Sequence, residues 1–150
     1  MAASVSLRVS TGTNAGTESS AQTGITLISA DALSGGSVSP GTNSYERWVR
    51  LAVDNPGDLI LTTFSFRGSP NLPDGVEIKY GVTDTPSTPV NTVSNIATHT
   101  LGTERVIFDA NSYSEAGDRT RYLVFQEQVA LTAPSGAITQ NLLAFSWSEA

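Results

Sequence analysis

The sequence predicts an all-β protein, an antiparallel β-sandwich of about seven to nine strands of Ig-like or jelly-roll-like type with an extended N-terminal arm. Short segments rich in Val, Ile, Thr, Phe and Tyr alternate with Gly, Pro, Asn, Asp and Ser clusters, and no amphipathic helical pattern separates them. The 150 residues fit one domain that can bury a core without disulfides, since there is no cysteine. A closed barrel is the alternative architecture.

Residues 1–43 differ from the rest because they are rich in Ser, Thr, Gly and Ala and contain no aromatic residue. Two strand-like runs lie in this region, Ser4–Ser10 and Ile25–Ser29. One interpretation is an irregular first hairpin, and the other is an extended arm that pairs with a neighbouring subunit by strand addition. In the second interpretation the alternating apolar residues of the first run are candidate contacts with other subunits or a capsid: Val5, Leu7 and Val9.

The sandwich domain is expected over residues 44–150, and it opens with two strands, Ser44–Asp54 and Asp58–Arg67. Between them, residues 55–58 (Asn-Pro-Gly-Asp) place Pro second and Gly third, as a type II turn requires. We therefore expect an antiparallel hairpin. In its second strand one face carries Ile60, Thr62, Phe64 and Phe66.

The middle of the chain predicts shorter strands separated by loops. Val76–Tyr80 alternates apolar and charged residues, and a loop with two prolines follows over Gly81–Val90. Ile96–Leu101 is an ambiguous short strand, and Glu104–Asp109 is a clearer one.

The last third predicts a second hairpin. Its first strand is Thr120–Leu131, with Leu123, Phe125, Val129 and Leu131 on one face. A turn over residues 133–136 (Ala-Pro-Ser-Gly) leads to Ile138–Ser148, in which Leu143, Phe145 and Trp147 are in register.

Charge and composition exclude several classes of function. Eight Lys and Arg against fourteen Asp and Glu give a net charge of −6, which opposes binding to nucleic acid and to anionic membranes. No apolar run approaches the ~18 residues of a membrane helix, and no secretory signal is visible. We expect a soluble protein made in a cytoplasm, and the lack of cysteine fits a reducing compartment.

The residues that carry chemistry do not assemble into a catalytic motif, so we expect no enzyme and no cofactor. His99 is the only histidine, it lies in a plain strand-like context, and no Gly-x-Ser-x-Gly elbow is present. Zinc or copper sites need His and Cys clusters. Calcium needs only oxygen ligands, and four candidates crowd one loop, but the full calcium-loop pattern is missing and solvated carboxylates are favoured. These weak calcium candidates are Asp109, Asn111, Glu115 and Asp118.

Tryptophan and arginine residues leave two further alternatives. Trp48 and Trp147 lie in alternating strands, which favours core packing over stacking on sugars. Arg47 and Arg50 flank Trp48 and point to opposite faces of its strand. They lie either at the rim of an edge strand or in an intersubunit ion pair with an acid such as Glu46, so both are candidate oligomer or capsid contacts.

Three segments carry a family resemblance that covers residues 43–149. Asn43-Ser-Tyr-Glu-Arg-Trp-Val-Arg-Leu51 opens a strand, Pro73-Asp-Gly-Val-Glu-Ile-Lys-Tyr-Gly-Val-Thr-Asp-Thr-Pro-Ser-Thr-Pro-Val90 follows a predicted hairpin, and the chain ends in Phe145-Ser-Trp-Ser-Glu149. This order resembles small β-sandwich structural proteins of tailed bacteriophages, of the capsid-decoration or auxiliary type. No catalytic residue comes with the resemblance.

The resemblance implies a virion protein on the capsid exterior, synthesised in the host cytoplasm. Such a protein is a homo-oligomer, often a trimer, that binds the major capsid protein and cements neighbouring capsomers. The alternatives are a phage tail or neck component and a host-surface glycan-binding β-sandwich module, because similar sandwiches serve different functions.

Overall fold

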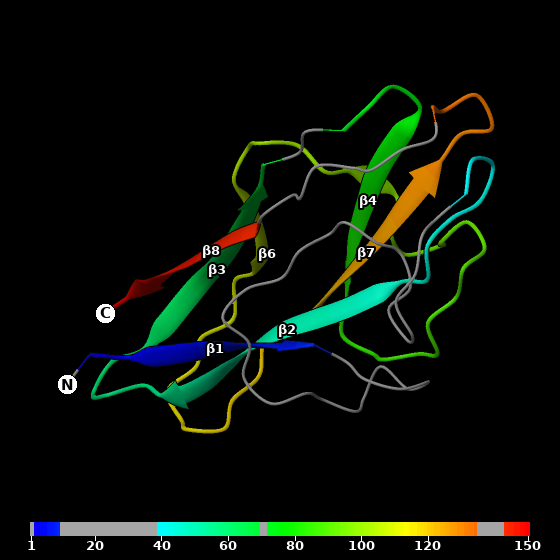
Figure 1. Cartoon of the computed structure of the whole chain (residues 1–150). Helices are drawn as coiled ribbons and strands as arrows, with labels where there is room; N and C mark the ends of the chain where they lie inside the picture. The colour runs from blue at the N-terminus through cyan, green and yellow to red at the C-terminus, as the bar shows by residue number, and fades with distance from the viewer. Residues whose placement is uncertain (1, 10–38, 70–71, 135–142) are drawn as a thin grey trace.

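The structure is a computed structural model of the whole chain, and it describes residues 2–9, 39–69, 72–134 and 143–150 (Figure 1). Within these residues it contains strands and loops and no helix. The strands are β1 (Ser4–Val9), β2 (Arg47–Asn55), β3 (Leu61–Gly68), β4 (Val76–Thr83), β5 (His99–Thr100), β6 (Val106–Asp109), β7 (Tyr122–Val129) and β8 (Leu143–Glu149).

Two antiparallel sheets form a β-sandwich, which confirms the predicted fold class. One sheet has five strands in the order β1-β2-β7-β4-β5, and the other has three in the order β6-β3-β8. The five-stranded sheet buries the alternating apolar side chains of β2 and β7 against the aromatic side chains of β3.

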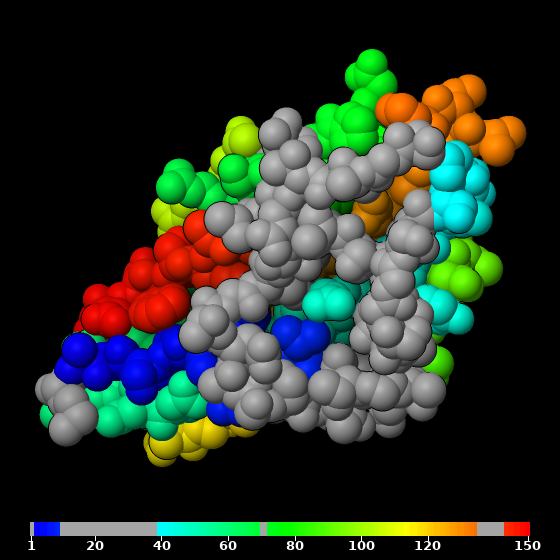
Figure 2. All heavy atoms as spheres, in the orientation of Figure 1, coloured from blue at the N-terminus to red at the C-terminus, as the bar shows by residue number. Residues whose placement is uncertain are grey.

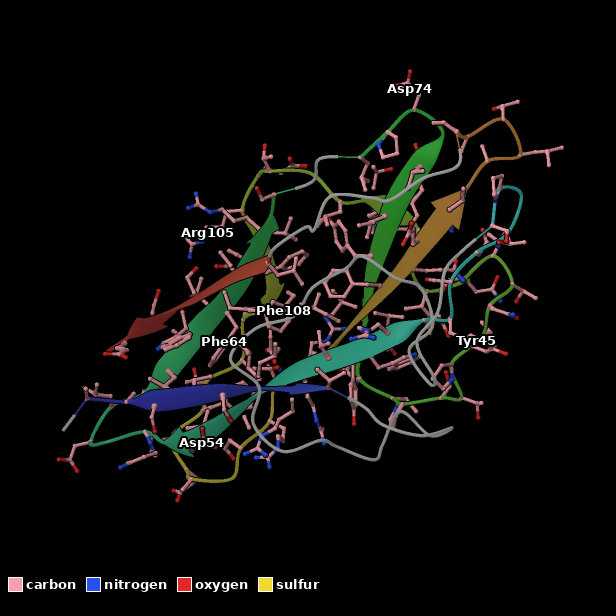
Figure 3. All side chains as sticks on the ribbon, viewed as in Figure 1. Tyr45, Asp54, Phe64, Asp74, Arg105 and Phe108 are labelled. Carbon is pink, nitrogen blue, oxygen red and sulfur yellow. The ribbon has the colours of Figure 1, made fainter. Side chains whose placement is uncertain are left out.

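The core lies between the two sheets and is rich in aromatic rings. Phe66 of β3 makes edge-to-face contacts with Phe125, Phe108 and Tyr80, at centroid distances of 5.8, 6.1 and 5.1 Å. Figure 3 labels two of the core aromatic residues, Phe64 and Phe108. The buried members of this cluster are Leu7, Val49, Leu51, Val53, Leu61, Phe64, Phe66, Ile78, Leu101, Phe108, Leu123 and Phe125.

Both predicted hairpins are wrong, although the strands themselves are present. β2 pairs with β1 and β7, whereas β3 pairs with β6 and β8, so the turn after Asn55 carries the chain from one sheet to the other. The turn has the expected chemistry, since Gly57 has a φ of 65° and its N–H donates to Asn55 Oδ1. β7 and β8 likewise lie in different sheets. Turn residues set the local bend, and packing decides whether the next strand returns to the same sheet.

The expected face of β3 is also wrong at its beginning, because the strand contains a bulge. Leu61 is buried, while Ile60 is 49% exposed. Thr62 pairs with Ser148 and Ser65 pairs with Ser146, so β3 has one residue more than β8 over this stretch. The extra residue shifts the alternation, and Thr63 within it has a φ of 55°, which is unusual for a β-branched residue.

Smaller differences concern where strands end. Leu131 is 81% exposed, because β7 stops at Val129 and the chain then turns away from the sheet. The ambiguous Ile96–Leu101 strand is reduced to the two residues of β5. The first predicted run is β1, which pairs with β2 of the same chain, and the Ile25–Ser29 run lies outside the described residues, as does most of the expected arm.

Candidate functional site

The outer face of the five-stranded sheet carries a second buried cluster, formed by Trp48, Tyr122 and Val124 with Ile96 packed against them. The rings of Trp48 and Tyr122 meet edge to face at 5.6 Å, and Trp48 is 1% exposed. Trp48 is therefore a core residue, as expected, and offers no surface for stacking on a sugar.

The loop after β4 covers this cluster and is held by buried polar side chains. Ser94 Oγ donates to Glu46 Oε2 at 2.6 Å, and the N–H of Val90 donates to Glu46 Oε1 at 3.1 Å. Gln126 accepts a hydrogen bond from the N–H of Ser94 at 3.0 Å and donates to the carbonyl of Thr92 at 2.6 Å. These bonds satisfy the carboxylate of Glu46 and the side-chain amide of Gln126, whereas the buried Nε1 of Trp48 has no partner among the described residues.

One glycine lets the same loop approach the sheet. A Cβ at Gly81 of β4 would collide with the carbonyl of Ile96, so only glycine fits at this position. The loop after β4 therefore packs directly against the five-stranded sheet.

The two candidate arginines lie on β2, which is an interior strand of the sheet between β1 and β7. The interpretation that they sit at the rim of an edge strand is therefore wrong. Arg50 places its guanidinium 4.5 Å from the centroid of the Tyr122 ring on the outer face, and Arg47 is half-buried on the opposite face. Glu46 is 2% exposed and bonded to Ser94 of its own chain, so Glu46 is not the acid of the alternative intersubunit pair, and contacts of the two arginines with another subunit or a capsid stay a prediction.

The candidate contacts of the N-terminal run belong to β1 and line the core of their own chain. Leu7 is 5% exposed, and Val5 and Val9 are half-buried against the same cluster. In register, Leu7 lies opposite Leu51 and Val9 opposite Val49. These side chains complete the five-stranded sheet, and their contacts with other chains stay a prediction.

Asp109, the first calcium candidate, is 2% exposed and anchors the loop after β6. Its Oδ2 accepts hydrogen bonds from the Tyr113 hydroxyl at 2.6 Å and from the N–H of Arg121 at 2.9 Å, and its Oδ1 accepts one from the N–H of Asn111 at 2.8 Å. Burial first, and then the bond to Asp109, raises the pKa of Tyr113 to about 12.

The remaining calcium candidates do not gather around Asp109 as a ligand set. Asp118 Oδ2 accepts hydrogen bonds from the N–H groups of Ser114 and Glu115, at 3.2 and 3.1 Å, and Glu115 and Asn111 are exposed. In the described part of the chain, no three acidic or histidine side chains lie together as a metal-binding group. The geometry favours carboxylates that hold loop backbone.

His99 lies exposed on β5, with its ring 5.5 Å from that of Tyr80 on the paired strand β4. Burial, and then the charge of Glu104, raises the pKa of Tyr80, so its phenol is neutral at ordinary pH. His99 is therefore an exposed histidine that lies beside a neutral tyrosine, as an ordinary surface histidine does.

Glu127 is a buried carboxyl group that the sequence reasoning missed. It is 5% exposed, and neither carboxylate oxygen has a hydrogen-bond partner among the residues that the structure describes. Burial raises its pKa to about 7. The sequence could have indicated this burial. Side chains alternate between the two faces of a strand, so Glu127 lies on the same face as Phe125 and Val129.

β1 lies at an edge of the five-stranded sheet, and β8 lies at an edge of the three-stranded sheet. Figure 2 shows the atoms of β1 (blue) and β8 (red) next to one another. Val5 and Val9 of β1 and Phe145 and Trp147 of β8 are only partly buried against the shared core. The ring of Trp147 lies 6.3 Å from that of Phe64, so Trp147 also packs against this core.

Comparison with protein-family models, with curated proteins and with solved structures finds no match to this chain. Within its described residues the structure has no helix that is long and apolar enough to cross a membrane. The functional proposal therefore depends on the residues of this chain.

Proposed function

We propose that this chain is a non-enzymatic structural protein of a virus particle, a capsid decoration protein that binds the outer capsid surface and copies of itself. The resemblance of residues 43–149 to phage β-sandwich proteins supports the location. The edge of β8, which pairs with no described strand on its side away from β3, supports protein binding as the function.

The β8 edge is the observation that carries the proposal. Among the described residues, β8 pairs only with β3, and its other side presents backbone N–H and C=O groups. Proteins normally protect such an edge with lysine, proline or a very short strand. β8 has seven residues (Leu-Ala-Phe-Ser-Trp-Ser-Glu), and none is lysine or proline. An edge of this kind suits the addition of a strand from a partner.

The way the loops are held also fits a structural protein. Glu46, Ser94, Gln126 and Asp109 are buried polar residues, and each is bonded to a loop or to its own strand. Such bonds fix loop conformation and give a rigid surface for docking. A phage tail or neck component would use the same edge, whereas burial of Trp48 disfavours a glycan-binding module.

Purified virus particles test the location. An antibody raised against the isolated protein should detect it in particles separated on a density gradient, and should label the outside of intact capsids in electron micrographs. Antibody label on the tail or neck would show that the protein is a tail or neck component and not a capsid decoration protein. Protein found only in the soluble fraction would overturn the proposal.

A further inference from the structure

A groove runs along the outer face of the three-stranded sheet, above β8 and beside β3. It consists of two hollows of about 470 and 430 Å³ that share Arg67 and Ala144. The outward side chains of β8 in this groove are small and exposed: Ala144, Ser146 and Ser148. They leave the space above the edge strand open.

Arg105 is held in place at one wall of this groove (labelled in Figure 3). Its Nε donates to Ser65 Oγ at 2.8 Å, and Ser65 Oγ lies 2.7 Å from Ser146 Oγ in a second hydrogen bond. Ser65 is 0% exposed, so the guanidinium of Arg105 is bonded to a buried hydroxyl, which in turn bonds to the exposed Ser146. Within the described residues the terminal nitrogens of Arg105 have no acceptor.

Arg67 forms the other cationic part of the groove. It lies opposite Ala144 in the β3–β8 register and is exposed. It makes no hydrogen bond or ion pair with any described residue. Among the described residues no Asp or Glu lines either hollow, in a protein whose net charge is −6. The described lining of the groove therefore carries two guanidinium groups and no carboxylate.

We propose that this groove binds the acidic side chain of an extended polypeptide segment that pairs with β8 along the edge that no described strand occupies. The inference rests on the strand addition proposed above and adds the chemistry of the partner. Guanidinium groups bind carboxylates through paired, charge-assisted hydrogen bonds, and a fixed guanidinium loses less entropy when it does so.

The geometry of a sheet explains how both features act together. A segment added to β8 lies about 4.8 Å from it, and every second side chain of the segment projects on the groove side. Because Ala144 and Ser146 are small, a Glu or Asp side chain there meets open space and then the guanidinium groups. Phe145 and Trp147 of β8 also line the first hollow and are partly buried against the core cluster.

Synthetic peptides test the inference with the full-length chain. One fluorescent peptide alternates threonine with glutamate, and a matched peptide has glutamine in place of glutamate. At low ionic strength, fluorescence anisotropy should show that the glutamate peptide binds about tenfold more tightly or better, the size expected for one charge-assisted contact. The variant Arg67→Gln should remove that difference, and its fold should be unchanged because Arg67 bonds to no described residue.

Two further variants separate the guanidinium contacts from general charge. Arg121→Gln removes the same charge from an ion pair with Asp84, away from the groove, and should leave peptide binding unchanged. Arg105→Lys keeps the charge but loses the bond from Nε to Ser65, and should weaken binding of the glutamate peptide.

The outcomes distinguish this inference from the proposed function. Equal binding of both peptides, unaffected by Arg67→Gln, would overturn the carboxylate site and leave strand addition standing. Binding of neither peptide would overturn both. Arg67-dependent binding of glucuronate in place of the peptide would overturn a polypeptide as the occupant.

Discussion

The Ser94 hydroxyl donates a hydrogen bond of 2.6 Å to Glu46 Oε2, and this bond joins the residue before β2 to a loop segment 48 residues away in the sequence. Ser94 Oγ also accepts hydrogen bonds from the N–H groups of Ile96 and Ala97. The pair therefore fixes both the position and the local turn of the loop over Trp48.

Ser94→Ala should destabilise the protein by about 1–3 kcal/mol, because a buried carboxylate loses its partner. Hydrogen exchange should become faster for the amides of residues 90–97, while the strands keep their protection. Ser87→Ala, at an exposed position of the same loop, is the control and should change neither quantity. Unchanged exchange in Ser94→Ala would contradict the role of the bond.

Tyr113→Phe should cost about 1–2 kcal/mol of unfolding free energy, because Asp109 loses the hydroxyl donor at 2.6 Å. Denaturant unfolding measures this loss. A stability equal to that of the wild type would show that the bond does not hold the loop.

Removal of calcium by EDTA should leave the melting temperature unchanged. Asp109 and Asp118 are already occupied by hydrogen bonds from their own loop. Differential scanning calorimetry with EDTA and with added calcium measures the effect. A higher melting temperature in calcium, abolished by Asp118→Asn, would contradict this expectation and support a calcium site in this loop.

Glu127→Gln should stabilise the protein at pH 8 by up to about 3 kcal/mol and have a much smaller effect at pH 5. The pKa of Glu127 is about 7 in the folded protein and near 4.5 in the unfolded chain. The folded state therefore holds an extra proton between these values, and the wild type loses stability as the pH rises through 7. Glutamine keeps the shape of the neutral acid.

Urea unfolding at several pH values between 5 and 8 gives this comparison. Glu115→Gln, at an exposed loop position, is the control and should show no such dependence. A gain from Glu127→Gln that is equal at pH 5 and pH 8 would contradict a buried carboxyl group with a raised pKa.

Ser6→Cys combined with Ala52→Cys should form a disulfide within one chain. These residues lie opposite each other in the β1–β2 register, at a spacing suited to a disulfide, and the natural chain has no cysteine to compete. Electrophoresis without reductant shows whether the bond is internal. Disulfide-linked dimers or larger species would mean that β1 is exchanged between subunits, as in the arm interpretation.

Strand location was predictable where packing imposes strict alternation. Val49, Leu51 and Val53 repeat every second residue and are all buried in the core. The same rule failed in β3, because a bulge at Thr63 changes the phase and no local residue type announces it. Strand pairing was not predictable from turns, since the Asn55 turn fits equally a hairpin and a crossing between sheets.

The polar contacts that hold the loops and the groove could not be predicted from the sequence, for a different reason. Glu46 with Ser94, and Arg105 with Ser65, join residues that are 48 and 40 positions apart. Each pair depends on how the loops return to the sheets, which no short-range pattern specifies. Glu127 was accessible in principle, because its phase in β7 matches that of the buried residues.

The solution mass of the purified protein, measured by light scattering coupled to size-exclusion chromatography over a dilution series, tests whether this is an assembly protein. We expect a stable homo-oligomer, and specifically a trimer of the 15.7 kDa chain. A monomer at every concentration would contradict self-assembly as part of the function.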